Sequence, residues 1–366
     1  MAEKQRSKHG GSDHRGRLRR LSGLVVVLAL LAGLASALAA AAAGPPGPPD
    51  LAQAISAKDR HAGKLLARAG VLGTGVGLES GRAVVVVLTA REGVSGIPDQ
   101  LDGVRVVVRV TGPIRALGTT APGATVAPSP EAKRGGTNPA SYFGRPVPIG
   151  VSTGNADECL AGTIGARVKN GSGVYALSNN HVYAEENGGT VGATVITQPG
   201  LYDLKGRNRC QYSGDYSLGR LAAFVPINFS TSAQNVVDAA IGATTDASLG
   251  NATPPNGYGT PSSTTATAAL NMAVEKYGRT TGLTTGSVCL TNVTVNVGYT
   301  SGVARFVDQF GVCKANFSQA GDSGSLIVTA EGDHPVGLLF AGGSGVTFAN
   351  PIDAVLSDLH VSVDGS

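Results

Sequence analysis

The sequence has few charged residues, and they are unevenly placed. Only 15% of the 366 residues are Asp, Glu, Lys or Arg, and the formal net charge is +4. Seven of the 29 basic residues and two of the 25 acidic residues lie in residues 1–20, so 22 basic and 23 acidic residues remain. A nearly neutral remainder gives no electrostatic support for binding nucleic acid, and we expect no nucleic-acid partner.

Aromatic residues are also scarce, at 5%, and tryptophan is absent. Gly, Thr, Ser and Val are abundant instead, which favours β-structure after the N-terminal region. A hydrophobic content of 42% is enough to build a core, so a chain that is disordered throughout is excluded. The length indicates two domains, or one large domain with extensions.

Residues 1–43 are typical of an export signal. A basic segment, 4–20, precedes an uncharged run, 21–43, that contains small-residue sites such as Ala41-Ala42-Ala43. The run is also long enough to cross a bilayer as an anchor. We therefore expect a secreted or extracytoplasmic protein that contacts a membrane only if this segment remains uncleaved.

Residues 44–117 predict a small α/β domain. A helical pattern starting at residue 51 precedes three strand-like runs, 71–78, 83–88 and 104–110. The glycines of the run 73–77 match no phosphate-binding spacing, so we attribute them to packing or to a turn.

Residues 118–146 are rich in Pro, Ala, Gly and Thr, which predicts an exposed linker open to proteolysis. Residues 147–366 alternate short strand-like runs with turns, which predicts a mainly β domain, a sandwich or paired barrels. A short helix over 351–359 is expected near its end. The expected strands are 161–168, 174–177, 191–196, 218–224, 238–241, 288–297, 326–328, 336–340 and 346–348.

The segment Gln319 to Ser325 carries the strongest chemical signal. We expect Ser323 on a tight turn that leads into the apolar run 326–328, with its hydroxyl exposed. The amides of Gly321 and Ser323 can then point to where a carbonyl oxygen becomes negatively charged, as acyl transfer requires. The alternative is an ordinary glycine-rich turn in a chain with 53 glycines.

A serine nucleophile needs a base, and His181 is the best placed of the six histidines because it directly follows a strand-like run. The third group should be a carboxylate that orients the imidazole. Asp238 lies within an apolar run, 235–241, where an unpaired acid would be costly to bury. Asp215 is the runner-up, in a turn-like context. The other histidines lie in the leader, the small domain, a polar turn and the last helix: His9, His14, His61, His334 and His360.

His181, Asp238 and Ser323 occur in the order His, Asp, Ser, and the segments around them resemble those of trypsin-like (chymotrypsin-fold) serine peptidases. The stretch 276–286 is similar to the one that opens the second barrel in bacterial members. The likeness extends over residues 147–360. It is to exported bacterial members with a small N-terminal domain and, more distantly, to plant narrow-leaf proteins.

The resemblance implies two six-stranded antiparallel β-barrels with the site in the cleft between them. Ser323 would be the nucleophile, His181 the general base and then acid, and Asp238 the group that orients the imidazole. The amides of Gly321 and Ser323 would form the oxyanion hole. Asp322 would brace the loop through an ion pair. Its partner would have to differ from the freshly cut N-terminal amine of the digestive enzymes.

The family layout also implies a primary substrate pocket without an acidic residue. A strict preference for Lys or Arg is therefore disfavoured, and a small or medium apolar side chain is expected. The residues that would line this pocket are Phe317, Ser318, Gln319, Ala341 and Gly342.

Four cysteines in an exported chain indicate disulfides, and no CxxC pair or Cys/His cluster suggests a metal, so we expect neither metal nor cofactor. Three pairings are possible. One bridge in each barrel, Cys159–Cys210 and Cys289–Cys313, keeps each loop within one folding unit and is favoured.

The sequence therefore predicts an exported serine endopeptidase that hydrolyses peptide bonds in peptide or protein substrates through an acyl-enzyme. The alternative is a catalytically silent trypsin-fold binding or scaffold protein at the cell surface. An esterase is less consistent, because the late β-region lacks the alternating α/β pattern of that fold.

Overall fold

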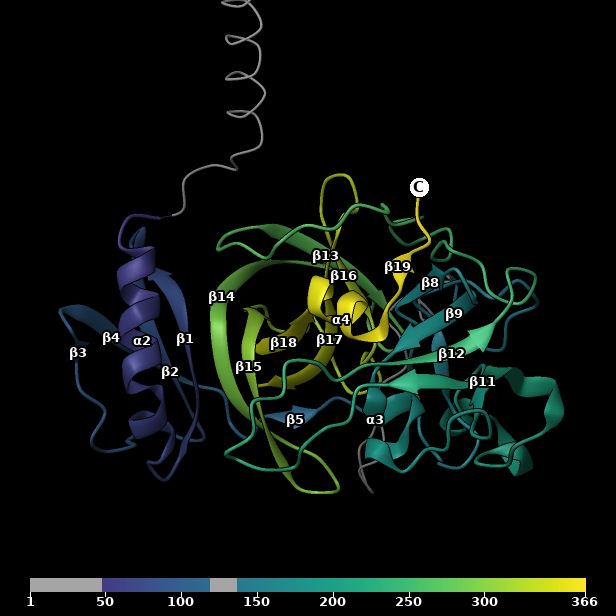
Figure 1. The fold of residues 1–366 in the computed structure, drawn as a ribbon, viewed down its shortest axis with the longest axis horizontal. Coiled ribbons are helices and arrows are strands. Elements are labelled where there is room, and N and C mark those ends of the chain that lie inside the picture. The colour runs from purple at the N-terminus through teal and green to yellow at the C-terminus, as the bar shows by residue number, and fades with distance from the viewer. Residues whose placement is uncertain (1–47, 119–136) are drawn as a thin grey trace, which may run out of the picture. The chain divides into compact units, whose positions relative to one another are not determined.

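The computed structural model describes residues 48–118 and 137–366 (Figure 1). The expected export segment and most of the expected linker lie outside the described residues. Within the described ranges, no helix combines the length and the apolar character needed to cross a membrane.

Residues 51–110 form a helix packed on a small sheet. The elements are α2 (Leu51–Leu66), β1 (Val71–Glu79), β2 (Arg82–Thr89), β3 (Gln100–Leu101) and β4 (Val104–Val110). β1 and β2 are antiparallel, whereas β2 and β4 are parallel. Their core buries alanines and leucines of the helix against valines of the strands. The helix and all three main strands lie where the sequence predicts them.

The first barrel contains the strands β6 (Ser152–Asn155), β7 (Gly162–Thr163), β8 (Ala166–Asn170), β9 (Gly173–Ser178), β10 (Val195–Thr197), β11 (Ser217–Phe224) and β12 (Ala240–Thr244). They pair in the order β8-β9-β12-β11-β10-β6-β7. β7 and β8 belong to one chain segment, interrupted for two residues, that pairs with β6 at one end and β9 at the other. The ring therefore closes with six strands. β19 (Ser362–Val363) adds to the β8 edge.

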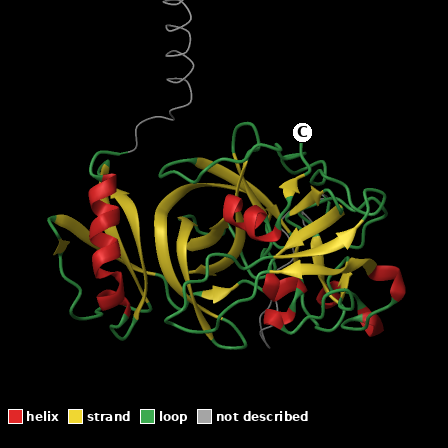
Figure 2. Ribbon diagram, in the orientation of Figure 1, coloured by secondary structure: helices red, strands yellow, loops and turns green. Residues whose placement is uncertain are grey.

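The second barrel contains β13 (Ala273–Gly278), β14 (Gly282–Gly298), β15 (Val303–Val312), β16 (Leu326–Thr329), β17 (Pro335–Gly343) and β18 (Val346–Pro351). The order β13-β16-β17-β18-β15-β14 is closed by pairing between β13 and β14, and all these pairs are antiparallel. The chain is mainly β (Figure 2), with α4 (Ile352–Leu359) near its end. It therefore has the two-barrel fold of trypsin-like serine peptidases, as the resemblance implied.

Three strand predictions need correction. The strand expected over 191–196 begins only at Val195, because residues 190–194 form a turn closed by hydrogen bonds to the Thr190 carbonyl. The strand expected over 161–168 breaks between β7 and β8. Asp238 precedes β12 instead of lying in it. The sequence analysis also did not predict β15.

The small unit joins the second barrel through β1, whose sheet continues into β14. Glycines of the run 73–77 permit this close approach. A Cβ at Gly73 would lie 2.9 Å from the Thr294 oxygen, and one at Gly75 would lie 2.9 Å from Val293 Cγ2. The glycine run is therefore a packing feature, one of its two predicted roles.

Two segments that flank residues 119–136 also contact the barrels. β5 (Arg115–Ala116) pairs with β17 and β14 of the second barrel. On the other side, the Pro139 carbonyl accepts a hydrogen bond from the Ser152 amide at 2.8 Å, and the Ser141 carbonyl accepts one from the Gln198 side chain at 2.8 Å. The end of the predicted linker thus lies against the first barrel.

Candidate active site

Ser323 lies on a tight turn directly before β16. The turn needs glycine because Gly321 and Gly324 have φ values of +97° and +92°. A side chain at Gly321 would overlap the Thr280 hydroxyl, and one at Gly324 would overlap the Ser178 hydroxyl. The expectation of an exposed Ser323 hydroxyl is wrong, since Ser323 is fully buried and its hydroxyl donates to the Phe340 carbonyl at 3.3 Å.

His181 and Asp238 form a buried pair on the first barrel. His181 lies in α3 (Asn180–Tyr183), a single turn that follows β9. Its Nδ1 is 2.6 Å from Asp238 Oδ2, and its backbone amide donates to Asp238 Oδ1 at 3.2 Å. These two hydrogen bonds to the Asp238 carboxylate fix the position of both the backbone and the imidazole ring of His181. Asp215, the runner-up, is exposed in a short 3-10 turn.

Tyr299, which the sequence analysis did not identify, completes the surroundings of Asp238. Its hydroxyl donates to Asp238 Oδ2 at 2.8 Å, and its ring packs edge-on against His181, with 5.8 Å between ring centres. Burial, and then the neighbouring Asp238 charge, raise the pKa of Tyr299 well above its usual value, so its phenol stays protonated and donates. Nothing in the local sequence relates this tyrosine to Asp238.

Residues 117–118 bring the histidine and the serine loop to one peptide unit. The amide of Gly321 donates to the Leu117 carbonyl at 2.6 Å, and the Leu117 amide donates to the Phe340 carbonyl at 3.1 Å. A Cβ at Gly118 would lie 3.3 Å from His181 Cδ2 and 3.7 Å from Nε2. The Phe340 carbonyl also accepts from the Ser323 hydroxyl, whereas His181 Nε2 has no hydrogen-bond partner among the described residues, so Ser323 and His181 lie near this peptide unit without a hydrogen bond to each other.

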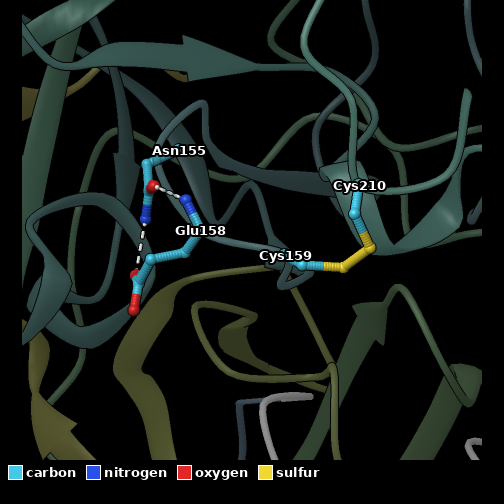
Figure 3. Close-up of a disulfide and its surroundings, with 4 residues drawn as sticks. All are labelled: Asn155, Glu158, Cys159 and Cys210. Carbon is cyan, nitrogen blue, oxygen red and sulfur yellow. Dashed lines mark hydrogen bonds between the residues drawn. A yellow bond between two sulfur atoms is a disulfide. The ribbon is translucent and has the colours of Figure 1, made fainter.

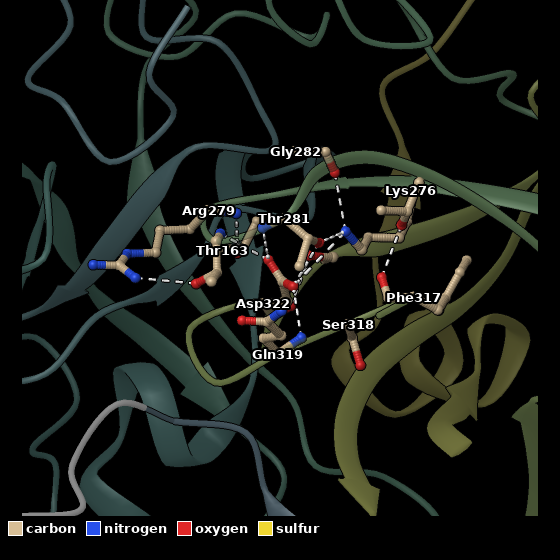
Figure 4. Close-up of polar contacts among 12 residues, drawn as sticks. Thr163, Lys276, Arg279, Thr281, Gly282, Phe317, Ser318, Gln319 and Asp322 are labelled. Atoms are coloured by element: carbon tan, nitrogen blue, oxygen red, sulfur yellow. Dashed lines mark hydrogen bonds and ion pairs between the residues drawn. The ribbon is translucent and has the colours of Figure 1, made fainter. Parts of the chain in front are cut away.

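Asp322, beside the candidate nucleophile, is held in a buried cage (Figure 4). Its Oδ1 accepts from the amides of Thr280 and Thr281 at 2.8 and 3.2 Å. Its Oδ2 accepts from the Thr281 hydroxyl at 2.8 Å and from the Gln319 amide at 2.9 Å. Lys276 Nζ lies 3.8 Å from Oδ2, and both side chains are fully buried. The ammonium of Lys276, not a chain terminus, therefore neutralises this carboxylate.

Arg279 links the same loop to the first barrel. Its guanidinium pairs with Asp203, and its amide donates to the Thr163 hydroxyl at 3.0 Å. That hydroxyl in turn donates to the Gly321 carbonyl at 2.9 Å. Burial lowers the pKa of Arg279, but the hydrogen bonds and charge of Asp203 outweigh this and give a net rise. The Arg279–Asp203 ion pair connects the two barrels.

The residues expected to line the primary pocket divide into two groups. Gly342 approaches the side chain of Leu117, and Phe317 belongs to the apolar cluster against which Leu117 packs. A Cβ at Gly342 would lie 3.1 Å from Leu117 Cδ1. The others have structural contacts: Ser318 hydrogen-bonds Thr347, the Gln319 amide bonds Asp322, and Ala341 is packed in the barrel core.

The two disulfides join Cys159 to Cys210 and Cys289 to Cys313, one in each barrel, as the sequence favoured. In the first barrel, the loop before Cys159 is stabilised by Asn155, whose side chain accepts from the Glu158 amide and donates to the Glu158 carboxylate, both at 2.8 Å (Figure 3). Cys159 and Cys210 join two loops of the first barrel, whereas the other bridge joins Cys289 in β14 to Cys313, directly after β15.

The carboxylates of Asp157, Glu158 and Glu185 lie close to one another, and Glu158 is close enough to His181 for their charges to interact. Burial, followed by the charges of Asp157 and Glu158, raises the pKa of Glu185 to about 7. Burial also raises the pKa of Glu158. Within residues 48–118 and 137–366, no group of three or more His, Cys, Asp or Glu side chains is placed to hold a metal ion.

Comparisons with known proteins give matches only among solved structures. No protein-family model and no curated protein matches the sequence. A glutamic-acid-specific serine protease is 22% identical, with a TM-score of 0.42, and the match covers 59% of this chain and 100% of that one. Thermobifida fusca Protease A is 21% identical, with a TM-score of 0.41 and coverage of 60% and 100%. Cellulomonas bogoriensis chymotrypsin is 19% identical, with a TM-score of 0.40 and coverage of 60% and 99%.

Proposed function

We propose that the chain is a serine endopeptidase that cleaves peptide bonds in peptide or protein substrates through an acyl-enzyme. The observation that carries this proposal is the convergence of three groups on one peptide unit. The Gly321 amide donates to the Leu117 carbonyl, a Cβ at Gly118 would lie 3.3 Å from His181 Cδ2, and Ser323 shares the Phe340 carbonyl with the Leu117 amide. A nucleophile, a base and an oxyanion donor are what acyl transfer requires.

In the proposed mechanism, Ser323 Oγ attacks the substrate carbonyl while His181 Nε2 takes its proton. Asp238 holds Nδ1–H at 2.6 Å and stabilises the imidazolium that forms. The amides of Gly321 and Ser323 stabilise the oxyanion, a contribution of about 3–4 kcal/mol for a single donor in comparable sites. His181 then protonates the leaving amine, and water hydrolyses the ester by the reverse sequence.

The cage around Asp322 supports a preformed site. Because Lys276 supplies the positive charge internally, the oxyanion-hole loop needs no newly cut N-terminus for its geometry. The residues around this loop are buried, and an oriented donor such as the Gly321 amide stabilises an oxyanion more strongly where water is excluded.

We further propose that the protein is exported. The two disulfides are typical of oxidising compartments, and the N-terminal sequence has the basic and apolar regions of an export signal. Cell fractionation of the full-length protein tests this, and a purely cytoplasmic location would contradict it.

A fluorophosphonate probe tests the peptidase proposal. The wild type should be labelled, whereas Ser323→Ala should not, and peptide hydrolysis should fall on the order of 10⁴-fold or more. Ser325→Ala is a matched control, since the Ser325 hydroxyl only donates to the Asp322 carbonyl at 2.7 Å. Equal labelling of wild type and Ser323→Ala would contradict the assignment and favour a catalytically silent binding protein.

A further inference from the structure

We propose that the Leu117–Gly118 bond is a cleavage site of this chain's own active site, and that the primary pocket takes leucine or an apolar side chain of similar size. This inference rests on the proposed peptidase function and names the substrate class of the same site.

Residues 114–117 bind the second barrel as a substrate strand would. β5 runs antiparallel to β17, with Ala116 opposite Ala341 and Arg115 opposite Gly342. The Leu117 amide extends this ladder to the Phe340 carbonyl, and the Gly298 amide donates to the Ile114 carbonyl at 3.0 Å on the other side. Main-chain pairing of this kind binds an extended peptide largely independently of its side chains.

The register of this strand puts one peptide bond at the candidate catalytic groups. The Leu117 carbonyl oxygen accepts from the Gly321 amide at 2.6 Å, which is the position a scissile carbonyl needs. Gly118 follows on the side of His181, since a Cβ added at Gly118 would lie 3.7 Å from Nε2, the atom that would protonate a leaving amine. That Nε2 is buried and has no hydrogen-bond partner among the described residues. Residue 117 thus lies on the acyl side and residue 118 on the leaving side.

The Leu117 side chain indicates what the pocket accepts. It packs against the apolar cluster that includes Phe317, and it uses the space left by the missing side chain of Gly342. A Cβ at Gly342 would already be 3.1 Å from Leu117 Cδ1, so residue 342 limits the size of the side chain that fits. Removing apolar leucine surface from water is favourable here, whereas an unpaired charge would be penalised.

The chemical step balances with water as the only co-reactant. Ser323 Oγ bonds to the Leu117 carbonyl carbon, the bond to the Gly118 nitrogen breaks, and the serine proton passes through His181 to that nitrogen. Water then cleaves the ester, which restores Ser323 and leaves a carboxylate on Leu117. The products are one chain that ends at Leu117 and one that begins at Gly118.

The product strand should remain in the site after cleavage. Residues up to 117 stay attached through the pairing of β1 with β14, where Gly73 lies opposite Val295 and Thr74 opposite Thr294. The new carboxylate of Leu117 would then continue to block Ser323, so the cut alone does not give full activity.

The experiment is to purify the full chain as wild type, Ser323→Ala, Leu117→Asp and Leu117→Met, and to follow intact mass and the N-terminal sequence of each fragment. The wild type and Leu117→Met should produce a fragment beginning at Gly118, at a rate independent of protein concentration. Ser323→Ala should remain intact. Leu117→Asp should be cut at this bond ~100-fold or more slowly, since its carboxylate does not suit the pocket.

Fluorophosphonate labelling of the same variants separates failure of this inference from failure of the proposed function. Leu117→Asp weakens the covering strand, so its Ser323 should be labelled faster than in wild type. Labelling of Ser323 without a cut between 117 and 118, or a cut that persists in Ser323→Ala, would overturn the inference alone. Absence of labelling in a folded Leu117→Asp protein would overturn both.

If Leu117→Asp does not fold, peptides of the form Arg-Ala-Xaa-Gly tested on the wild type keep the inference falsifiable. Leucine at Xaa should be cleaved at least about tenfold faster than lysine or glutamate. A preference for a charged residue would overturn the assignment of the pocket.

Discussion

The Tyr299 hydroxyl donates a hydrogen bond to Asp238, and its effect on activity can be measured separately from the packing of the ring. Tyr299→Phe removes the donor to Asp238 and keeps the ring packed on His181. A hydrogen bond to a charged group is worth about 1.5–3 kcal/mol, so we expect kcat to fall by about 10- to 100-fold with KM little changed. Tyr258→Phe is the matched control, because its buried hydroxyl has no hydrogen-bond partner among the described residues. An unchanged kcat in Tyr299→Phe would assign the tyrosine to packing alone.

Gly342 should control specificity. Gly342→Val fills the space that Leu117 Cδ1 occupies at 3.1 Å from the added Cβ. We expect kcat/KM for leucine substrates to fall by about tenfold or more relative to alanine substrates, since a side chain of one or two carbons still fits. Parallel assays with the two peptide series measure this ratio. A ratio equal to that of the wild type would show that the pocket lies elsewhere.

Glu185 makes stability depend on pH. Its pKa rises from 4.5 to about 7 on folding, chiefly through burial, so the folded state holds this proton more tightly than the unfolded state. The free energy of unfolding should therefore fall as the pH rises from 4.5 to 7. In Glu185→Gln this fall should be smaller, as urea denaturation across that range can measure. Glu331→Gln, which changes an exposed carboxylate, is the control and should keep the wild-type profile.

At the scale of residues, the sequence can propose groups that carry a local signature but not groups defined by tertiary contact. Ser323 is a candidate because of its glycine turn, and His181 and Asp238 are candidates because of their contexts and order. Tyr299 lies 61 positions from Asp238, and its hydroxyl has no signature of its own. Burial of Ser323 was also unpredictable, because it depends on contacts with residues distant in the sequence, such as Thr163 and Phe340.

At the scale of elements, the stretch 276–286 acts as one half of the Asp322 cage. Lys276→Met would leave Asp322 as a buried carboxylate without a cation, which costs about 3–5 kcal/mol of stability. We expect a lower urea midpoint and a loss of probe labelling, because Asp322 adjoins Ser323. The double variant Lys276→Met/Asp322→Asn should lose less stability than the two single losses added together. Additive losses would mean that the two side chains do not act as a pair.

The strands show which features of a sheet a local sequence pattern can predict and which it cannot. Short apolar runs such as those of β2, β4 and β9 were recognised because their alternation or β-branched content is local. β14 is longer than predicted, and its register depends on four neighbours, β1, β5, β13 and β15, which no local pattern reveals. Barrel closure through β13 and β14 is likewise a property of the whole sheet.

At the scale of the molecule, the sequence predicts a small α/β domain over residues 44–117 separate from the peptidase domain, whereas the described residues from 48 to 366 form one compact unit in which β1 pairs with β14. Changes in amino-acid composition along the chain indicate where one segment ends and the next begins. They do not indicate which segments pair, and the pairing of β1 with β14 depends on the fit between two distant strands. The glycines of the run 73–77 looked like a turn or packing feature, and the partner strand could not be read from them. If the proposed cleavage is correct, this contact is what keeps residues 115–117 at the site.

Weakening this contact should therefore release activity once the chain has been cut. Gly75→Val introduces a Cβ 2.9 Å from Val293 Cγ2, which forces β1 away from β14. The fragment ending at Leu117 should then dissociate on size-exclusion chromatography, and peptide hydrolysis should rise. Gly63→Ala is the matched control, because its Cβ meets nothing within 4 Å on the same unit. If the Gly75→Val fragment dissociates but hydrolysis stays at the wild-type level, the strand ending at Leu117 is not what restrains the enzyme.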